Sequence, residues 1–216
     1  MKIDAAKSAI VAVDYQRAFT TEGDFGKAFE KEDVQPIDDA LLRGAEFMRG
    51  PGVSIATRIK ISAVYEPGQF TNGDLQAPLA QLCVPGSDGV NDFIEFPGEW
   101  DSVTKSTPDA TREEPFRDWL QQKVVDAGIK TLYVMGCTIT TCLGETAAGI
   151  RRTLPGEISI ILAKDLAGGR RGHYLQDPVT GKSRADRVFD YLQASGITVI
   201  DSLEDEAEQP VEAKNT

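Results

Sequence analysis

The sequence predicts a three-layer α/β/α, Rossmann-like domain with a mainly parallel sheet of six strands. Short apolar segments rich in β-branched residues alternate along the chain with longer segments of helical period. The apolar segments have the composition of strands buried on both faces, as a parallel sheet requires. Strands and helices that alternate at this spacing form right-handed crossovers on one sheet. Because the pattern contains no internal repeat, we expect one domain.

Six strands and four amphipathic helices are expected in order along the chain. The strands are expected over residues 8–14, 52–58, 101–106, 130–136, 157–165 and 196–202. The helices are expected over residues 36–50, 113–128, 141–154 and 184–196. The domain therefore covers residues 1–203, and the acidic segment 204–216 is expected to be a disordered tail.

Two irregular segments are longer than ordinary connections. The segment 62–99 is rich in Gly, Pro, Asn and Asp, and the segment 168–183 has the same character. Segments of this kind are usually functional loops or lids, so substrate specificity is expected to depend on them. The second segment contains His173, the only histidine, for which we expect a solvent-exposed position.

Composition narrows the range of partners. The chain of 216 residues has a formal net charge of −11, which disfavours nucleic acid and anionic membranes because both would repel it. The N-terminal apolar run is too short to span a membrane and is followed by no signal-type cleavage pattern, so a cytoplasmic protein is expected. Three cysteines indicate reduced thiols, and with one histidine they are too few for an ordinary zinc site. We expect no metal and no cofactor.

Three reactive side chains follow predicted strands. Ligands of open parallel sheets bind beyond the carboxyl ends of the strands, where Asp14, Lys105 and Cys142 are expected. Cys142 falls in the first turn of a predicted helix, whose dipole favours the thiolate. A thiol, a carboxylate that takes its proton and an ammonium group together form an activated nucleophile. Taken singly, the same residues also suit a buried apolar cysteine, a capping aspartate and a solvated lysine.

Four motifs carry a family resemblance. They are "VDYQRAF" for a D-x-Q-x-x-F start, "CVPGSDG" for a V-x-G-[ST]-x-G loop, "TKSTPDA" for a lysine strand, and "GCTITTCLGETA" for a G-x-x-T-x-x-C-[VL]-x-x-T-A signature. Together they resemble the isochorismatase-like cysteine hydrolases, which include nicotinamidases, N-carbamoylsarcosine amidases, ureidoacrylate amidohydrolases and biuret hydrolases. The resemblance covers about residues 8–166.

The resemblance implies a catalytic triad of Asp14, Lys105 and Cys142. It also implies a cis peptide between Cys137 and Thr138, with the amides of Thr138 and Cys142 forming an oxyanion hole. Cys137 then belongs to this turn and has no chemical role, and members of the family commonly form dimers or tetramers. We accordingly expect a homo-oligomer.

Five further residues are expected to contact a substrate. Gln16, Arg17 and Phe19 lie on the segment after the first strand, Arg58 is expected after the second strand, and Trp100 precedes the lysine strand. An arginine can bind a carboxylate through two hydrogen bonds, so the positive groups suit a small anionic amide such as a carbamoyl or maleamate-like acid. A surface role for Arg58 and a core role for Phe19 fit the sequence equally well.

The sequence also departs from the family pattern. Nicotinamidases carry an Asp-x-His and further histidines after the second strand, whereas "TRIKISAVYEPGQF" contains no histidine and no such aspartate. The isochorismatase branch proper hydrolyses a vinyl ether and lacks the cysteine. The prediction is therefore a metal-independent cysteine amidohydrolase, which cleaves a C–N bond of a small amide, ureide or carbamoyl compound through a thioester.

Three alternatives stay open. The first is a vinyl-ether hydrolase in which Asp14 is the general acid and Cys142 is incidental. The second is a protein without enzymatic activity. The third is a redox protein that uses Cys137 and Cys142, although their spacing differs from the C-x-x-C of redox motifs.

Overall fold

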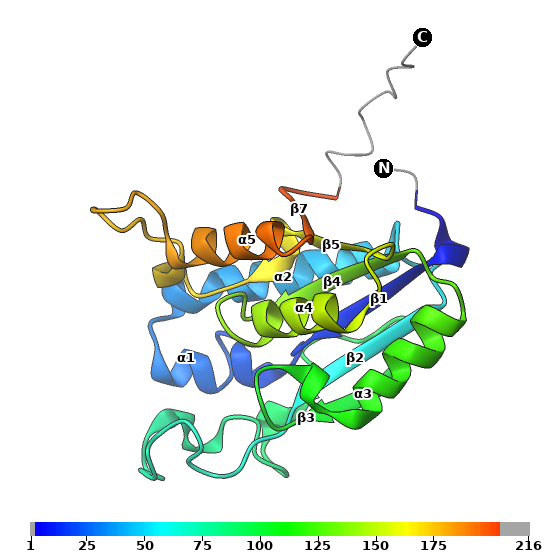
Figure 1. Cartoon of the computed structure of the whole chain (residues 1–216). Helices are drawn as coiled ribbons and strands as arrows, with labels where there is room; N and C mark the ends of the chain where they lie inside the picture. The colour runs from blue at the N-terminus through cyan, green and yellow to red at the C-terminus, as the bar shows by residue number, and fades with distance from the viewer. Residues whose placement is uncertain (1–2, 204–216) are drawn as a thin grey trace.

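The computed structural model describes residues 3–203, which form one sheet flanked by helices (Figure 1). The strands are β1 (Ser8–Val13), β2 (Thr57–Ala63), β3 (Asp101–Lys105), β4 (Thr131–Cys137), β5 (Ser159–Ala163), β6 (Ala167–Gly168) and β7 (Thr198–Ile200). All strand pairs are parallel, in the order β3-β2-β1-β4-β5-β7, and the two-residue β6 pairs with β4. The predicted α/β fold with a parallel sheet is confirmed.

Helices cover both faces of the sheet. They are α1 (Asp24–Ala28), α2 (Lys31–Arg49), α3 (Glu114–Trp119), which continues as a π-helix over Leu120–Asp126, α4 (Cys142–Thr153) and α5 (Arg184–Ala194). Figure 1 shows α2 behind the sheet and α3 and α4 in front of it. The four predicted helices are present, while α1 was not expected.

The alternation of side chains along β1 divides the core in two. Because successive side chains of a strand point to opposite faces, Val11 and Val13 pack with α3, α4 and α5. Ile10 and Ala12 pack with α2 on the other face. Every residue of β1 is buried, so this central strand has the apolar sequence that a parallel sheet demands.

The second strand begins later than predicted. The prediction of 52–58 is wrong for most of its length, because Val53 is 51% exposed and β2 runs from Thr57 to Ala63. The buried positions Ile59, Ile61 and Ala63 alternate with less buried residues, so the segment does not form a continuous apolar run. The residues that follow β2 are therefore Val64 and Tyr65.

The connections also contain short helical turns. The segment 62–99 begins with the end of β2 and includes 3-10 turns over Pro78–Gln81 and Asp88–Val90. Within residues 3–203, no helix is both long and apolar enough to cross a membrane. The predicted tail over 204–216 lies outside the described residues, so that expectation stays a prediction.

Candidate active site

Three strands place Asp14, Lys105 and Cys142 at the carboxyl edge of the sheet. Asp14 directly follows β1, Lys105 is the last residue of β3, and Cys142 begins α4 after the turn that follows β4. All three are buried, and even the charged Lys105 is only 1% exposed. The structure thus brings together the three residues that the sequence singled out.

A buried ion pair lies at the centre of this cluster. The ammonium nitrogen of Lys105 is 2.9 Å from Oδ2 of Asp14, and neither side chain is exposed. The Cys142 thiol lies close enough to both groups for each of them to shift its pKa. Because a charge removed from water is costly unless it is paired, each partner favours the ionised form of the other.

Burial decides the resting protonation state of the thiol. Burial raises the pKa of Cys142 to about 11; the Asp14 carboxylate adds to this shift, while the positive charge of Lys105 opposes it. The expected effect of the α4 dipole is therefore outweighed, and Cys142 is a neutral thiol at neutral pH. An attack by Cys142 requires a base, and the carboxylate within its reach is Asp14.

Lys105 remains charged in this environment. Burial lowers the pKa of Lys105, but its interactions with Asp14 and Cys142 outweigh burial and raise it above the ordinary value. Burial also raises the pKa of the Asp14 carboxyl, and Lys105 opposes that shift. Lys105 is therefore a permanent cation beside both Asp14 and Cys142, and it favours the negative form of either neighbour.

The turn between β4 and α4 has a special backbone. The peptide bond from Cys137 to Thr138 is cis, at the position that the family resemblance implied. The amide nitrogens of Thr138 and Cys142 donate no hydrogen bond to another residue within 3–203. Just before the turn, Gly136 has a φ of 126°, and an added Cβ would lie 2.0 Å from the carbonyl oxygen of Val13. Only glycine allows β4 to approach β1 this closely.

Tyr65 joins the cluster, although the sequence analysis did not find it. Its hydroxyl oxygen lies 3.3 Å from the Lys105 nitrogen and 3.5 Å from the Cys142 sulfur. Tyr65 is the second residue after β2, so it was missed because that strand was predicted too early. The alternation of Ile59, Ile61 and Ala63 is the signal that could have placed it.

Comparison with known proteins identifies the fold. No protein-family model matches the chain, and neither does any curated protein. The pyrazinamidase of Pyrococcus horikoshii, solved in complex with zinc, is 16% identical, with a TM-score of 0.68 over 91% of this chain and 99% of its own. An isochorismatase family protein from Desulfovibrio vulgaris is 18% identical, with a TM-score of 0.63 over 94% and 99% of the two chains. The chain has the isochorismatase-family fold. The N-carbamoylsarcosine amidase of Thermoplasma acidophilum shares it at 20% identity, with a TM-score of 0.60 over 92% and 99%.

Within the isochorismatase-family fold, two of the predicted substrate residues, Gln16 and Phe19, are buried and contact other parts of the protein. Gln16 is buried, and its side-chain amide accepts from the N–H of Ala63 at 2.7 Å and donates to the Ala63 carbonyl at 3.0 Å. Phe19 is buried in the core with its ring edge against Phe25. Arg17 is half exposed and lies 3.5 Å from Asp88, so it is the member of this segment whose side chain reaches solvent.

The expectation that Arg58 and Trp100 line the site is wrong. Arg58 is the second residue of β2 and Trp100 directly precedes β3, so both lie at the amino ends of their strands, opposite the edge that holds Cys142. The Arg58 guanidinium lies over the Trp100 ring, and both side chains donate to the carbonyl of Pro97. The late start of β2 is the reason for the error at Arg58. Trp100 precedes β3 as predicted, and a residue that precedes a parallel strand lies at the amino end of that strand.

The expected exposure of His173 is also wrong. Its side chain is buried, and Nδ1 lies 2.9 Å from the hydroxyl of Thr140 in the turn before α4. Burial and the nearby Arg170 and Arg184 lower the pKa of His173 to about 4, so the ring is neutral at pH 7. His173 therefore ties the segment 168–183 to the turn that holds Thr138.

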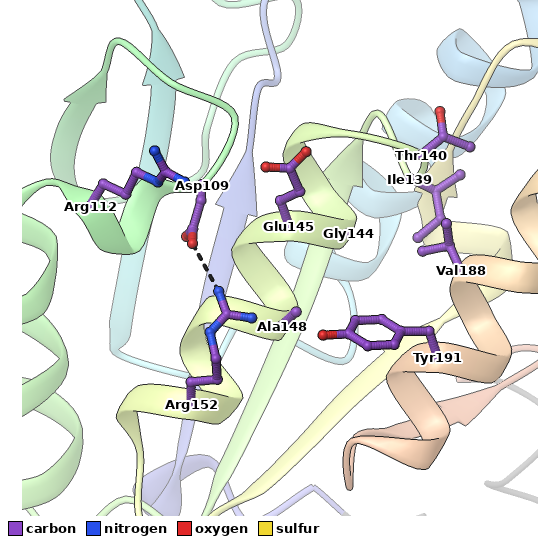
Figure 2. Close-up of a pocket in the computed structure, with 10 residues that line it drawn as sticks. All are labelled: Asp109, Arg112, Ile139, Thr140, Gly144, Glu145, Ala148, Arg152, Val188 and Tyr191. Carbon is purple, nitrogen blue, oxygen red and sulfur yellow. Dashed lines mark hydrogen bonds and ion pairs between the residues drawn. The ribbon is translucent and has the colours of Figure 1, made fainter.

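A separate hollow of about 300 Å³ lies on another side of α4 (Figure 2). It is lined by Asp109, Arg112, Ile139, Thr140, Gly144, Glu145, Ala148, Arg152, Val188 and Tyr191. Figure 2 shows the ion pair between Arg152 and Asp109 at one side and the Tyr191 ring at the other. Neither Asp14 nor Cys142 lines it, so this hollow is distinct from the buried cluster.

Proposed function

We propose that the protein is a metal-independent cysteine hydrolase that cleaves a C–N bond of a small amide, ureide or carbamoyl compound through a thioester. The observation that carries the proposal is the buried pair of Asp14 and Lys105 within reach of the Cys142 thiol. A nucleophile, a base and a fixed cation in one dry site are the parts that acyl transfer needs. A similar fold in an N-carbamoylsarcosine amidase supports the same reaction class.

The first step of the proposed mechanism forms a thioester. Asp14 takes the proton of Cys142 as the sulfur attacks the substrate carbonyl, and Lys105 stabilises the sulfur while it is negative. The carbonyl oxygen becomes an oxyanion that the amides of Thr138 and Cys142 are placed to bind, since neither donates to another residue within 3–203. When the intermediate collapses, Asp14 returns its proton to the leaving nitrogen, and the C–N bond breaks.

The second step releases the acid. Asp14, again a carboxylate, takes a proton from a water molecule whose oxygen attacks the thioester carbonyl. The C–S bond then breaks, and the proton returns to the Cys142 sulfur as the carboxylic or carbamic acid leaves. Each group ends in the state in which it began, so the cycle needs no further reactant.

Metal independence belongs to the proposal on the basis of the available side chains. Among residues 3–203, no three His, Cys, Asp or Glu side chains are grouped so that they could hold a metal ion. The similar pyrazinamidase, in contrast, was solved in complex with zinc. The substrate of this chain is accordingly proposed to be held by protein groups alone. Because Arg58 lies at the opposite edge of the sheet, we do not assign it a substrate carboxylate.

A vinyl-ether hydrolase is the second candidate function. Burial raises the pKa of the Asp14 carboxyl, and this shift favours a protonated Asp14 that could act as a general acid. In that reaction the Cys142 sulfur would form no bond. The location in the cytoplasm and the assembly into dimers or tetramers stay predictions.

An ammonia-release screen over primary amides, ureides and carbamoyl acids tests the proposal. The parent is expected to release ammonia from at least one class, and Cys142→Ala is expected to lose at least 10⁴-fold in kcat, on the order of the loss seen for other covalent nucleophiles. Cys83→Ala is the matched control, because Cys83 is also a buried free thiol but has no role in the mechanism. A Cys142→Ala variant that retains the ammonia release of the parent would contradict the thioester mechanism. A parent that releases ammonia from none of these compounds would contradict the amidase proposal and leave the vinyl-ether reaction as the candidate.

A further inference from the structure

Tyr65 touches two members of the cluster but has no part in the mechanism above. Its hydroxyl is 3.5 Å from the Cys142 sulfur and 3.3 Å from the Lys105 nitrogen, and the residue is almost fully buried. The Lys105 nitrogen also lies 5.6 Å from the centre of the Tyr65 ring. A polar group this close to a nucleophilic sulfur and shielded from water acts on that sulfur more strongly than it would in solution.

The surrounding protein fixes the position of the Tyr65 ring. The backbone N–H of Tyr65 donates to the carbonyl of Cys83 at 3.1 Å. The ring packs edge to face with Phe70, with 4.7 Å between the ring centres. The hydroxyl is therefore aimed at the site by packing and by a backbone hydrogen bond.

The number of available protons determines the direction of the hydrogen bonds. The ammonium group of Lys105 can only donate, so the Tyr65 oxygen accepts from it. The hydroxyl has a single proton of its own, and the Cys142 sulfur, 3.5 Å away, is its remaining partner within residues 3–203. The Tyr65 proton is consequently directed at the sulfur.

The protonation state of Tyr65 agrees with this direction. Burial raises the pKa of Tyr65 well above its ordinary value, and the charges of Asp14 and Cys142 add to the shift. Tyr65 therefore keeps its proton at every pH at which the enzyme would work. The hydrogen bond between Tyr65 and Cys142 also lowers the pKa of the Cys142 thiol, in opposition to the effect of burial.

We propose that Tyr65 is a fourth member of the nucleophilic group, whose hydroxyl donates a hydrogen bond that stabilises the Cys142 thiolate. The inference rests on the proposed function, since it assumes that the thiolate is the attacking species. Lys105 polarises the Tyr65 hydroxyl, so the charge of the ammonium group reaches the sulfur through the tyrosine as well as directly. Loss of one hydrogen bond to a charged acceptor is expected to lower the thiolate population by roughly tenfold or more.

The rate at which iodoacetamide alkylates Cys142 tests this inference without a substrate. Only the thiolate reacts, so below the pKa of the thiol the rate measures the thiolate fraction. The peptide that contains Cys142 is quantified by mass spectrometry at several pH values from 7 to 9, and Cys142→Ala gives the background from Cys83 and Cys137. Tyr65→Phe, which removes a single oxygen, is expected to slow alkylation about tenfold at each pH.

Tyr15→Phe is the matched control. Tyr15 is equally buried, and its hydroxyl has no hydrogen-bond partner within residues 3–203, so this variant should react like the parent. Equal alkylation rates for Tyr65→Phe and the parent would overturn the inference. If Tyr65→Phe does not fold, 3-fluorotyrosine at position 65 replaces it. As a stronger donor of nearly the same shape, it should speed alkylation, and an unchanged rate would overturn the inference.

The alkylation test and the ammonia-release screen can contradict the role of Tyr65 and the proposed function independently of each other. If Tyr65→Phe is alkylated normally while Cys142→Ala is inactive, the role of Tyr65 is wrong and the proposed function stands. If Cys142→Ala retains amidase activity while Tyr65→Phe is alkylated slowly, the hydrogen bond is real and the proposed function is wrong.

Discussion

Lys105→Met breaks the central ion pair and makes the stability of the fold depend on pH. The two partners are 2.9 Å apart and unexposed, so the variant leaves the Asp14 carboxylate buried without a counter-charge. Breaking such a pair costs about 3–5 kcal/mol. Asp14 avoids that cost if its carboxyl is protonated in the folded state. For a carboxyl with an ordinary pKa of 3.8, the free energy of protonation is unfavourable by about 4 kcal/mol at pH 7 and by about 1.6 kcal/mol at pH 5.

The sign of the pH dependence follows from the direction of the pKa shift. In the variant, the folded-state pKa of Asp14 lies above its unfolded value, so the folded chain binds more protons. The stability that Asp14 contributes to the Lys105→Met variant is therefore fully present below pH 3.8 and is lost as the pH rises through the folded-state pKa. Relative to the parent, the loss in unfolding free energy is expected to grow from about 2 kcal/mol at pH 5 to about 4 kcal/mol at pH 7.

Urea unfolding followed by circular dichroism at pH 5 and pH 7 measures this difference. The double variant Asp14→Asn with Lys105→Met lacks the carboxyl and should lose the extra pH dependence. Lys182→Met is the surface control, because the pair of Lys182 and Asp190 is exposed and its loss should leave stability almost unchanged. A loss for Lys105→Met that is the same at both pH values would refute the argument, because it would show that Asp14 is not the group left uncompensated.

Two further predictions concern the backbone before the turn and the opposite edge of the sheet. Gly136→Ala is expected to lower the unfolding free energy by about 2–5 kcal/mol, because φ is positive at this residue and the new Cβ would meet the Val13 carbonyl. Gly156→Ala is the control, because a Cβ there meets nothing within 4 Å and the variant should be nearly neutral. Thermal unfolding compares the two variants, and equal midpoints would contradict the contact between β4 and β1. Arg58→Ala is expected to leave kcat/KM within about twofold of the parent, because its side chain lies at the amino end of β2, and a loss of 10² or more would restore it to the substrate site.

The sequence was a good guide wherever local pattern decides the structure. The apolar run of β1 and the motif before α4 placed Asp14 and Cys142 correctly, because the end of a buried strand and the start of a helix are local features. The lysine at the end of β3 was placed correctly for the same reason. The convergence of these three residues then followed from the parallel order of the strands.

The error at β2 shows what a local pattern cannot supply. The strand alternates buried and less buried residues, so Lys60 and Ser62 interrupt the apolar run that was used to find strands. The shift of five residues removed Tyr65 from the predicted site and added Arg58. The misplaced start of β2 therefore explains why Tyr65 was missed and why Arg58 was wrongly expected, but it does not explain Trp100, which precedes β3.

The burial of a side chain by residues far away in the sequence was the other feature that could not be predicted. In the sequence Lys105 resembles a surface lysine, but in the structure Tyr65 and Asp14 contact it. His173 was likewise expected to be exposed, but Thr140 contacts it. Such contacts join residues more than 30 positions apart. The pKa of the Cys142 thiol depends on the same burial, and for that reason the helix dipole alone gave the wrong resting state.

The most direct test of the central claim is the mass of the enzyme during turnover. With any substrate found in the ammonia-release screen, the reaction is quenched in acid and the peptides are analysed by mass spectrometry. The account predicts that the peptide with Cys142 gains the mass of the acyl or carbamoyl group, and that Cys142→Ala gains none. Turnover that leaves the Cys142 peptide unmodified, with activity retained in Cys142→Ala, would contradict the claim that this sulfur attacks the substrate.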